Sequence, residues 1–124
     1  MHDLSFDLAA LAAFYEKGGD PADVALEALR RAQAQAKLNG WILVREEQDI
    51  LAEAKALKSR DRAKLPLYGV PFAVKDNIDA AGLPTTAACP EFASVPAADA
   101  PAVALLRAAG AILIGKTNLD QFAT

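Results

Sequence analysis

Hydrophobic residues recur at helical spacing in three stretches of the first half of the chain. Residues 4–17 and 46–59 each place apolar side chains on one helical face. Between them, Asp20 followed by Pro21 is typical of a helix start, because the carboxylate caps the first free N–H groups and proline suits the first helical position. We expect that central helix to run over residues 21–36.

The rest of the chain alternates between short apolar runs and polar segments. Residues 41–44 are rich in strand formers, and residues 70–74 are apolar without alternation, as in a strand covered on both faces. A long loop at 79–98 precedes a predicted helix at 101–109 and a second buried strand at 111–115. Strand, helix and strand in this order predict a parallel pair joined by a right-handed crossover.

These elements predict an α/β fold with two parts. Residues 1–64 form a helical N-terminal segment that ends in a polar stretch, and residues 65–124 begin an α/β core. The chain stops at Thr124 inside a pattern that continues as a helix, without a residue that would close it. We therefore expect an incomplete sheet and an N-terminal piece of a longer protein.

Composition excludes several classes of function. The 124 residues are 53% hydrophobic with a formal net charge of −3, and no basic stripe suggests nucleic acid. We see no secretory signal and no apolar run long enough to span a bilayer, which leaves a cytoplasmic location and no membrane partner as the expectation. The chain has one cysteine and one histidine, His2, so we expect no metal site and no cofactor.

Lys75 is the first candidate for chemistry, because it ends the apolar run 70–74. A lysine that loses water around its ammonium becomes a base near neutral pH, whereas a nearby carboxylate such as Asp76 opposes that change. Neighbouring side chains on a strand point to opposite faces, so Asp76 need not touch Lys75. The residues alone favour the more ordinary interpretation, a strand-end lysine whose ammonium reaches water.

Two other patterns attract attention and are set aside. Cys89 with Lys75 and either Asp76 or Asp79 is a conceivable Cys/Lys/acid amidase site, but a free cysteine is usually a small buried hydrophobe. Gly110 to Thr117 meets the bare spacing of a phosphate loop. The residues between its glycines are strand formers, and backbone N–H groups paired in a sheet cannot cradle phosphate. We reject nucleotide binding and expect Thr117 or Asn118 to cap a helix begun by Leu119.

Four motifs in order resemble the amidase signature family. They are Gly69-Val-Pro-Phe-Ala-Val-Lys-Asp-Asn77, Gly82-Leu-Pro-Thr-Thr-Ala87, Leu105-Leu-Arg-Ala-Ala-Gly-Ala111 and Gly115-Lys-Thr-Asn-Leu-Asp-Gln-Phe-Ala123. The segment 86–90, which includes Cys89, is most similar to the allophanate hydrolases of that family. The resemblance covers 65–124 closely and the helical N-terminus loosely, and it implies that 65–124 contributes the first strands and crossover helix of an amidase-signature mixed sheet.

The resemblance also implies a Ser–cis-Ser–Lys triad in which Lys75 is the base. Neither catalytic serine carries over, because Ser5, Ser59 and Ser94 all lie outside a Gly/Ser-rich context. The serine loop and the substrate-selecting residues would follow Thr124, so the substrate-binding residues are unknown and the chain alone is expected to be inactive. The implied substrate is a small amide, allophanate first, and the full-length protein is expected to be a homo-oligomer. The alternatives are another amidase, a glutamyl-tRNA amidotransferase A-type subunit, or a non-catalytic assembly module.

Overall fold

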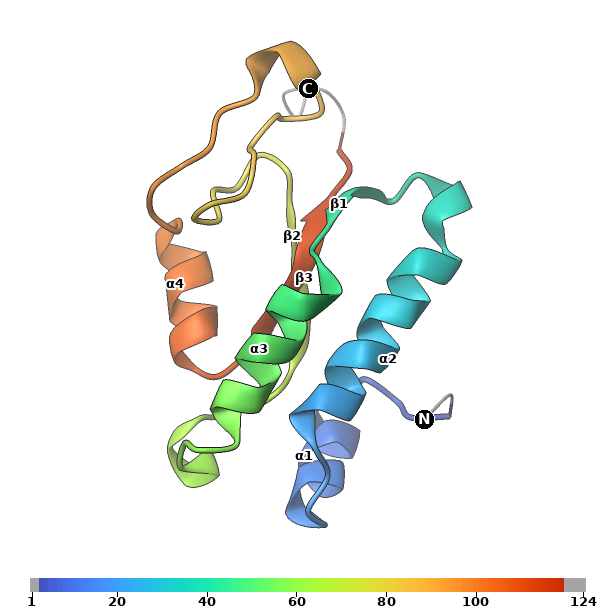
Figure 1. Cartoon of the computed structure of the whole chain (residues 1–124), viewed down its shortest axis with the longest axis vertical. Helices are drawn as coiled ribbons and strands as arrows, with labels where there is room; N and C mark the ends of the chain where they lie inside the picture. The colour runs from blue at the N-terminus through green and yellow to red at the C-terminus, as the bar shows by residue number, and fades with distance from the viewer. Residues whose placement is uncertain (1–2, 120–124) are drawn as a thin grey trace.

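The computed structural model describes residues 3–119, which form a small mixed sheet with helices on both faces (Figure 1). Its α-helices are α1 (Leu8–Glu16), α2 (Pro21–Ala34), α3 (Glu47–Leu57) and α4 (Pro101–Ala108). Its strands are β1 (Trp41–Val44), β2 (Pro71–Lys75) and β3 (Ile112–Thr117). Three 3₁₀ turns, η1 (Ala36–Leu38), η2 (Arg62–Lys64) and η3 (Pro90–Phe92), complete the order. The α/β class is therefore confirmed.

The strands lie in the order β1-β3-β2, with β3 in the centre. β2 and β3 run parallel and are joined through α4, which confirms the predicted crossover unit. β1 pairs antiparallel with β3. Gly115 allows this close pairing, because a Cβ there would lie 2.1 Å from the Leu43 carbonyl oxygen. The segment before residue 65 thus supplies an edge strand to the same sheet as the segment after it.

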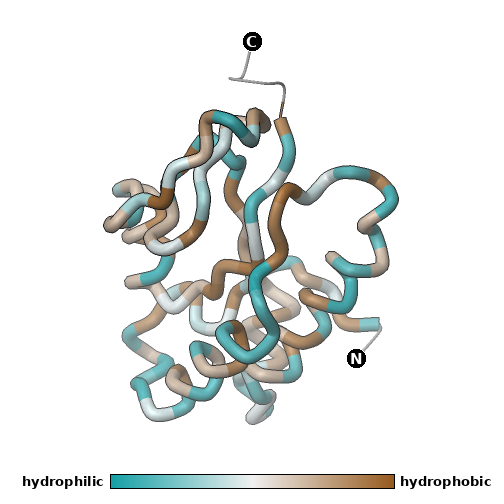
Figure 2. Tube along the Cα trace, turned by 45° about the horizontal axis from the view of Figure 1, so that its top comes forward, coloured by the Kyte–Doolittle hydropathy of each residue, from teal (hydrophilic) through white to brown (hydrophobic). Residues whose placement is uncertain are grey.

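Alternating residues of β3 divide the core between the two faces of the sheet. Ile112 and Ile114 pack with buried residues of α2 and α3, whereas Leu113 packs with Val103 of α4 and with Val74 of β2. Figure 1 shows α4 on one side of the strands and α2 and α3 on the other. Figure 2 shows hydrophobic stretches along the central strands. β3 is buried along almost its whole length, which explains its lack of alternation. The expectation that residues 70–74 are covered on both faces is wrong for residues 3–119, because β2 is an edge strand and exposes Ala73.

Local signals determine most helix boundaries. Asp20 accepts a hydrogen bond from the Ala22 backbone N–H at 2.9 Å, so the predicted cap of α2 is confirmed. The α-helix ends at Ala34 rather than at 36, where a 3₁₀ turn follows it. The loop 79–98 is more structured than predicted, since it contains η3 and a bridge between Thr85 and Ser94.

The motif before β2 is tied to the N-terminal helix. The buried Tyr15 hydroxyl donates a hydrogen bond of 2.8 Å to the Gly69 carbonyl oxygen. Tyr15 also packs edge-on against Tyr68, with ring centroids 5.0 Å apart. The N-terminal segment therefore positions the chain that leads into β2.

Candidate functional site

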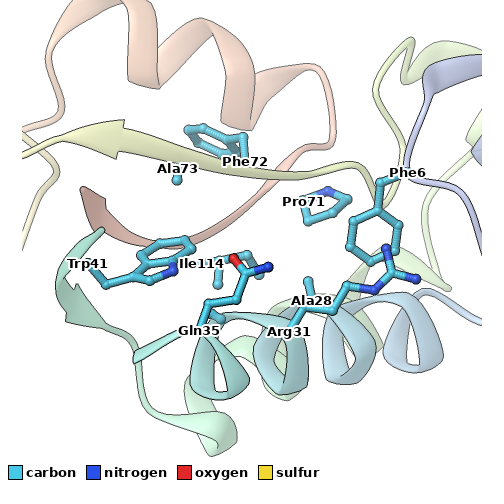
Figure 3. A pocket seen from close by; sticks show the side chains of 10 residues that line it. Phe6, Ala28, Arg31, Gln35, Trp41, Pro71, Phe72, Ala73 and Ile114 are labelled. Atoms are coloured by element: carbon cyan, nitrogen blue, oxygen red, sulfur yellow. The ribbon is translucent and has the colours of Figure 1, made fainter. Parts of the chain in front are cut away.

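Lys75 is the last residue of β2 and lies beside Thr117 of β3. Its side chain is exposed and forms no hydrogen bond or ion pair with any other described residue. Figure 3 shows Ala73 on the face of β2 that looks toward Trp41 and α2, and Phe72 on the opposite face. By strand alternation Lys75 shares the face of Ala73. The prediction of Lys75 at a strand end is therefore confirmed, and within residues 3–119 its ammonium faces solvent.

The buried lysine is Lys116, which lies one strand away. It is 0% exposed, and its Nζ lies 3.2 Å from Asp76 Oδ1 and 3.2 Å from the Pro84 carbonyl oxygen. Asp76 is also 0% exposed, so both members of this ion pair are removed from water. Asp76 thus pairs with Lys116 and not with Lys75, as the alternation of side chains along a strand allows, whereas the partner Lys116 was not predicted.

Asp76 is held at each of its polar groups. Its backbone N–H donates to the Thr117 carbonyl at 2.9 Å, and its own carbonyl accepts from the Ala87 N–H at 3.1 Å. The Thr86 hydroxyl donates to Oδ2, while Oδ1 faces Lys116 in an ion-pair contact rather than an aligned hydrogen bond. The residue that follows Lys75 is thereby fixed to β3 on one side and to the 85–89 loop on the other.

That loop contains a tight turn made of residues that rarely adopt its conformation. Ala87 and Ala88 have φ values of 52° and 64°, and the Cys89 N–H donates to the Thr86 carbonyl at 2.8 Å. Two central residues with positive φ and this hydrogen bond are typical of a type I′ turn, which normally uses Gly or Asn. The alanines persist in this conformation because the loop is anchored on both sides of the turn.

The structure does not assemble the Cys/Lys/acid arrangement. Cys89 Sγ lies 3.4 Å from the Glu91 carboxylate, whereas activated cysteines have a neighbouring cation. Asp76 is paired with Lys116, and Asp79 accepts a hydrogen bond from the Thr85 hydroxyl at 2.8 Å. Neither carboxylate is therefore directed at the sulfur.

The Gly115-Lys116-Thr117 segment lies within β3 and is paired with strands on both sides. This confirms the strand assignment on which we rejected a phosphate loop. Asn118 donates to the Asn39 carbonyl and accepts from the Leu119 N–H, both at 2.9 Å. The predicted helix beyond Leu119 lies outside the described residues.

A cavity of about 280 Å³ lies between α2 and the β2 side of the sheet (Figure 3). Its polar lining side chains are Arg31, stacked 4.1 Å from the centre of the Phe6 ring, and Gln35. The remaining lining residues are apolar: Phe6, Ala28, Ala32, Trp41, Pro71, Phe72, Ala73 and Ile114. Lys75 is not among them, so this cavity is separate from the strand-end lysine.

Among residues 3–119 no group of three or more His, Cys, Asp or Glu side chains could hold a metal ion. In the same range, no helix combines the length and apolarity needed to cross a bilayer.

The chain matches a family model, described as Amidase, over residues 23–124. It is 57% identical over 101 residues to a urea amidolyase of Saccharomyces cerevisiae, covering 80% of this chain and 6% of that protein. It is 38% identical over 125 residues to the A-type subunit of the glutamyl-tRNA(Gln) amidotransferase of Lachnospira eligens, covering 97% and 26%.

Two solved structures share the fold. A Kluyveromyces lactis allophanate hydrolase superposes with a TM-score of 0.82 at 43% identity, over 95% of this chain and 20% of that one. A peptide amidase from Stenotrophomonas maltophilia gives 0.83 at 33%, over 94% and 25%. The chain thus spans about a quarter or less of each of these relatives.

Proposed function

Because this chain belongs to the amidase family, we propose that it is the N-terminal part of an amide-bond hydrolase with a Ser–cis-Ser–Lys triad. The observation that carries the proposal is the position of Lys75 at the carboxyl end of a parallel strand, directed away from the buried ion pair beside it. Ligands of open parallel sheets collect at these ends. Lys75 is the lysine of the first motif and would serve as the triad base.

In the proposed reaction, the second serine attacks the amide carbon while its proton passes through the bridging cis-serine to Lys75. The C–N bond then breaks, the proton returns along the same path to the leaving nitrogen, and water hydrolyses the acyl-serine to release the acid and restore the serine. Backbone N–H groups of the serine loop would stabilise the oxyanion. A lysine is a base near neutral pH only when water is excluded from it, so the rest of the full-length protein would have to cover Lys75.

The serines of this chain are poor candidates for those roles. Ser5 donates to Asp7 Oδ2 at 3.0 Å, and Ser59 donates to the Ala56 carbonyl at 2.9 Å, so both form local turns. Ser94 is exposed and pairs through its backbone with Thr85. We therefore propose that the 124 residues alone are inactive and that both serines come from the remainder of the full-length protein.

The proposed substrate is allophanate, which would be converted to ammonia and carbon dioxide. Support comes from the 57% identity to a urea amidolyase and the 43% identity to an allophanate hydrolase structure. The amidotransferase A-type subunit remains the second candidate, because such a relative aligns over 97% of this chain. A non-catalytic assembly module is the third. The proposal includes a cytoplasmic, homo-oligomeric enzyme with a small-molecule amide as its partner.

Ammonia release by the full-length protein tests the substrate. We expect turnover of allophanate to exceed that of simple amides such as acetamide at equal concentration. Equal or better turnover of simple amides would contradict the allophanate assignment while leaving the amidase assignment in place. The absence of a Gly/Ser-rich serine loop from the reading frame after Thr124 would contradict the enzyme itself.

A further inference from the structure

Four groups surround the Asp76 side chain and backbone, and we call them together the Asp76 clamp: Lys116, Thr86, Thr117 and Ala87. The clamp supplies hydrogen bonds to the N–H, the carbonyl and Oδ2 of Asp76 and an ion-pair contact to Oδ1. It joins the end of β2 to β3 and to the turn at 86–89. Asp76, which the clamp holds, directly follows Lys75 in the sequence.

Stability does not explain a charged pair at this position. Both side chains are 0% exposed, and removing two charges from water costs about as much as their attraction returns. Replacing a buried ion pair by apolar residues of similar volume is often neutral or stabilising, and the neighbouring core residues Leu113 and Val103 are apolar. What the charges and hydrogen bonds add is direction, because together they fix Asp76 at a set angle to its neighbours.

We propose that the Asp76 clamp is a positioning device for Lys75, with Lys116 and Thr86 as positioning residues. This inference rests on the proposed function of Lys75. Strand β2 ends at Lys75, so the next residue determines how the Lys75 backbone leaves the sheet. With Asp76 pinned toward the α4 side, Lys75 is held toward the opposite face.

Lys116 is not a second base in this arrangement. Its ammonium is fully buried, touches the Asp76 carboxylate and donates to the Pro84 carbonyl at 3.2 Å. It has no access to a substrate in solution. Lys116 therefore acts through Asp76, whereas Lys75 is the group exposed to the reaction.

The test compares variants of the full-length protein that keep the clamp or weaken it. Thr86→Val removes the hydroxyl that donates to Asp76 while preserving side-chain shape, and Thr86→Ser preserves the hydroxyl. Because small displacements of reacting groups cost up to about 100-fold in rate, we expect Thr86→Val to lower kcat by about 10-fold or more, with KM within about twofold. Thr86→Ser should keep at least about half of the wild-type kcat.

Ile50→Val supplies a matched control for stability. Ile50 is 0% exposed in the core between α2, α3 and the sheet, so this variant loses stability without altering the clamp. Its kcat at 25 °C should equal that of the wild type. If Thr86→Val instead keeps wild-type kcat, or if Thr86→Ser loses as much kcat as Thr86→Val, the positioning role is wrong.

Lys116→Met is a second, independent test, because it weakens the Asp76 clamp without changing Thr86. It should also lower kcat with little change in KM, and Lys116→Arg, which keeps the cation, should recover part of the loss. Lys116→Met with wild-type kcat would overturn the inference. A failure of the proposed function can be distinguished from a failure of the positioning role, since Lys75→Ala would remain active only if the proposed function is wrong.

Discussion

Replacing Lys116 with methionine should strongly destabilise the end of the sheet, because it leaves the buried Asp76 carboxylate without its cation. At the 3.2 Å separation of Nζ and Oδ1, the attraction is about 5 kcal/mol for an effective dielectric constant of about 20. Breaking one partner of a buried pair typically costs about 3–5 kcal/mol. We expect a loss of that size in the free energy of opening this region for Lys116→Met, and a similar loss for Asp76→Asn.

The double variant separates a true pair from two independent sites. With both charges removed, the new amide at position 76 would retain an oxygen for the Thr86 hydroxyl, and no unpaired charge remains. The combined loss should therefore fall short of the sum of the single losses by about 2 kcal/mol or more.

Native-state hydrogen exchange of the full-length protein, read on peptides that cover 71–76 and 112–117, measures these free energies where the change is made. Losses that add within about 0.5 kcal/mol would refute the coupling that we derive from the geometry.

Three further predictions concern Tyr15, the turn at Ala87-Ala88, and Cys89. The pKa of Tyr15 is raised above its ordinary value, mainly because its hydroxyl is buried and to a smaller extent because Tyr68, Asp20 and Asp23 lie nearby. The unfolded chain therefore loses this proton first, so the contribution of Tyr15 to stability should be constant below about pH 10 and fall above it. Tyr15→Phe should abolish the loss of stability above about pH 10 and should lower the free energy of unfolding at neutral pH by about 1–3 kcal/mol, because the buried Gly69 carbonyl loses its donor. Urea unfolding at pH 7 and pH 11 measures both effects. A Tyr15→Phe variant with the pH dependence of the wild type would contradict the raised pKa of Tyr15. Ala88→Gly should raise the free energy of unfolding by about 1 kcal/mol, since Ala88 has a φ of 64°. Ala87→Gly should raise the free energy of unfolding less, because it also loses a buried methyl group. Destabilisation by Ala88→Gly would argue against the turn geometry. Cys89→Ala should leave appreciable amide hydrolysis in the full-length protein, whereas total loss would restore the cysteine hypothesis.

The order and type of the elements were predictable because their signals are local. Apolar runs without alternation marked β2 and β3, and Asp20-Pro21 marked the start of α2. The strand–helix–strand unit then followed from the right-handed crossover rule. The antiparallel pairing of β1 with β3 was not predictable in this way, because a four-residue apolar run carries no signal for its partner.

The buried Lys116–Asp76 pair was not predictable, because it depends on the register between β2 and β3. Lys75 and Lys116 both end apolar strands, and sequence alone treats them alike. The pairing of β2 with β3 shifts between Phe72 and Ala73, so Ile114 is passed over and Lys116 lies beside Val74. A one-residue slip exchanges the faces of all later side chains. This shift puts Lys116 on the buried face with Val74 and leaves Lys75 on the exposed one.

Hydrolysis by a Lys75→Ala variant of the full-length protein tests the central claim most directly. Lys64→Ala is the matched control, since Lys64 is an exposed lysine in η2, on the segment that leads into the start of β2 and not at its end. Ammonia release should be abolished in Lys75→Ala and unchanged in Lys64→Ala, while circular dichroism shows the same folded state for both. Near-normal turnover by Lys75→Ala would remove Lys75 from the mechanism and contradict the account.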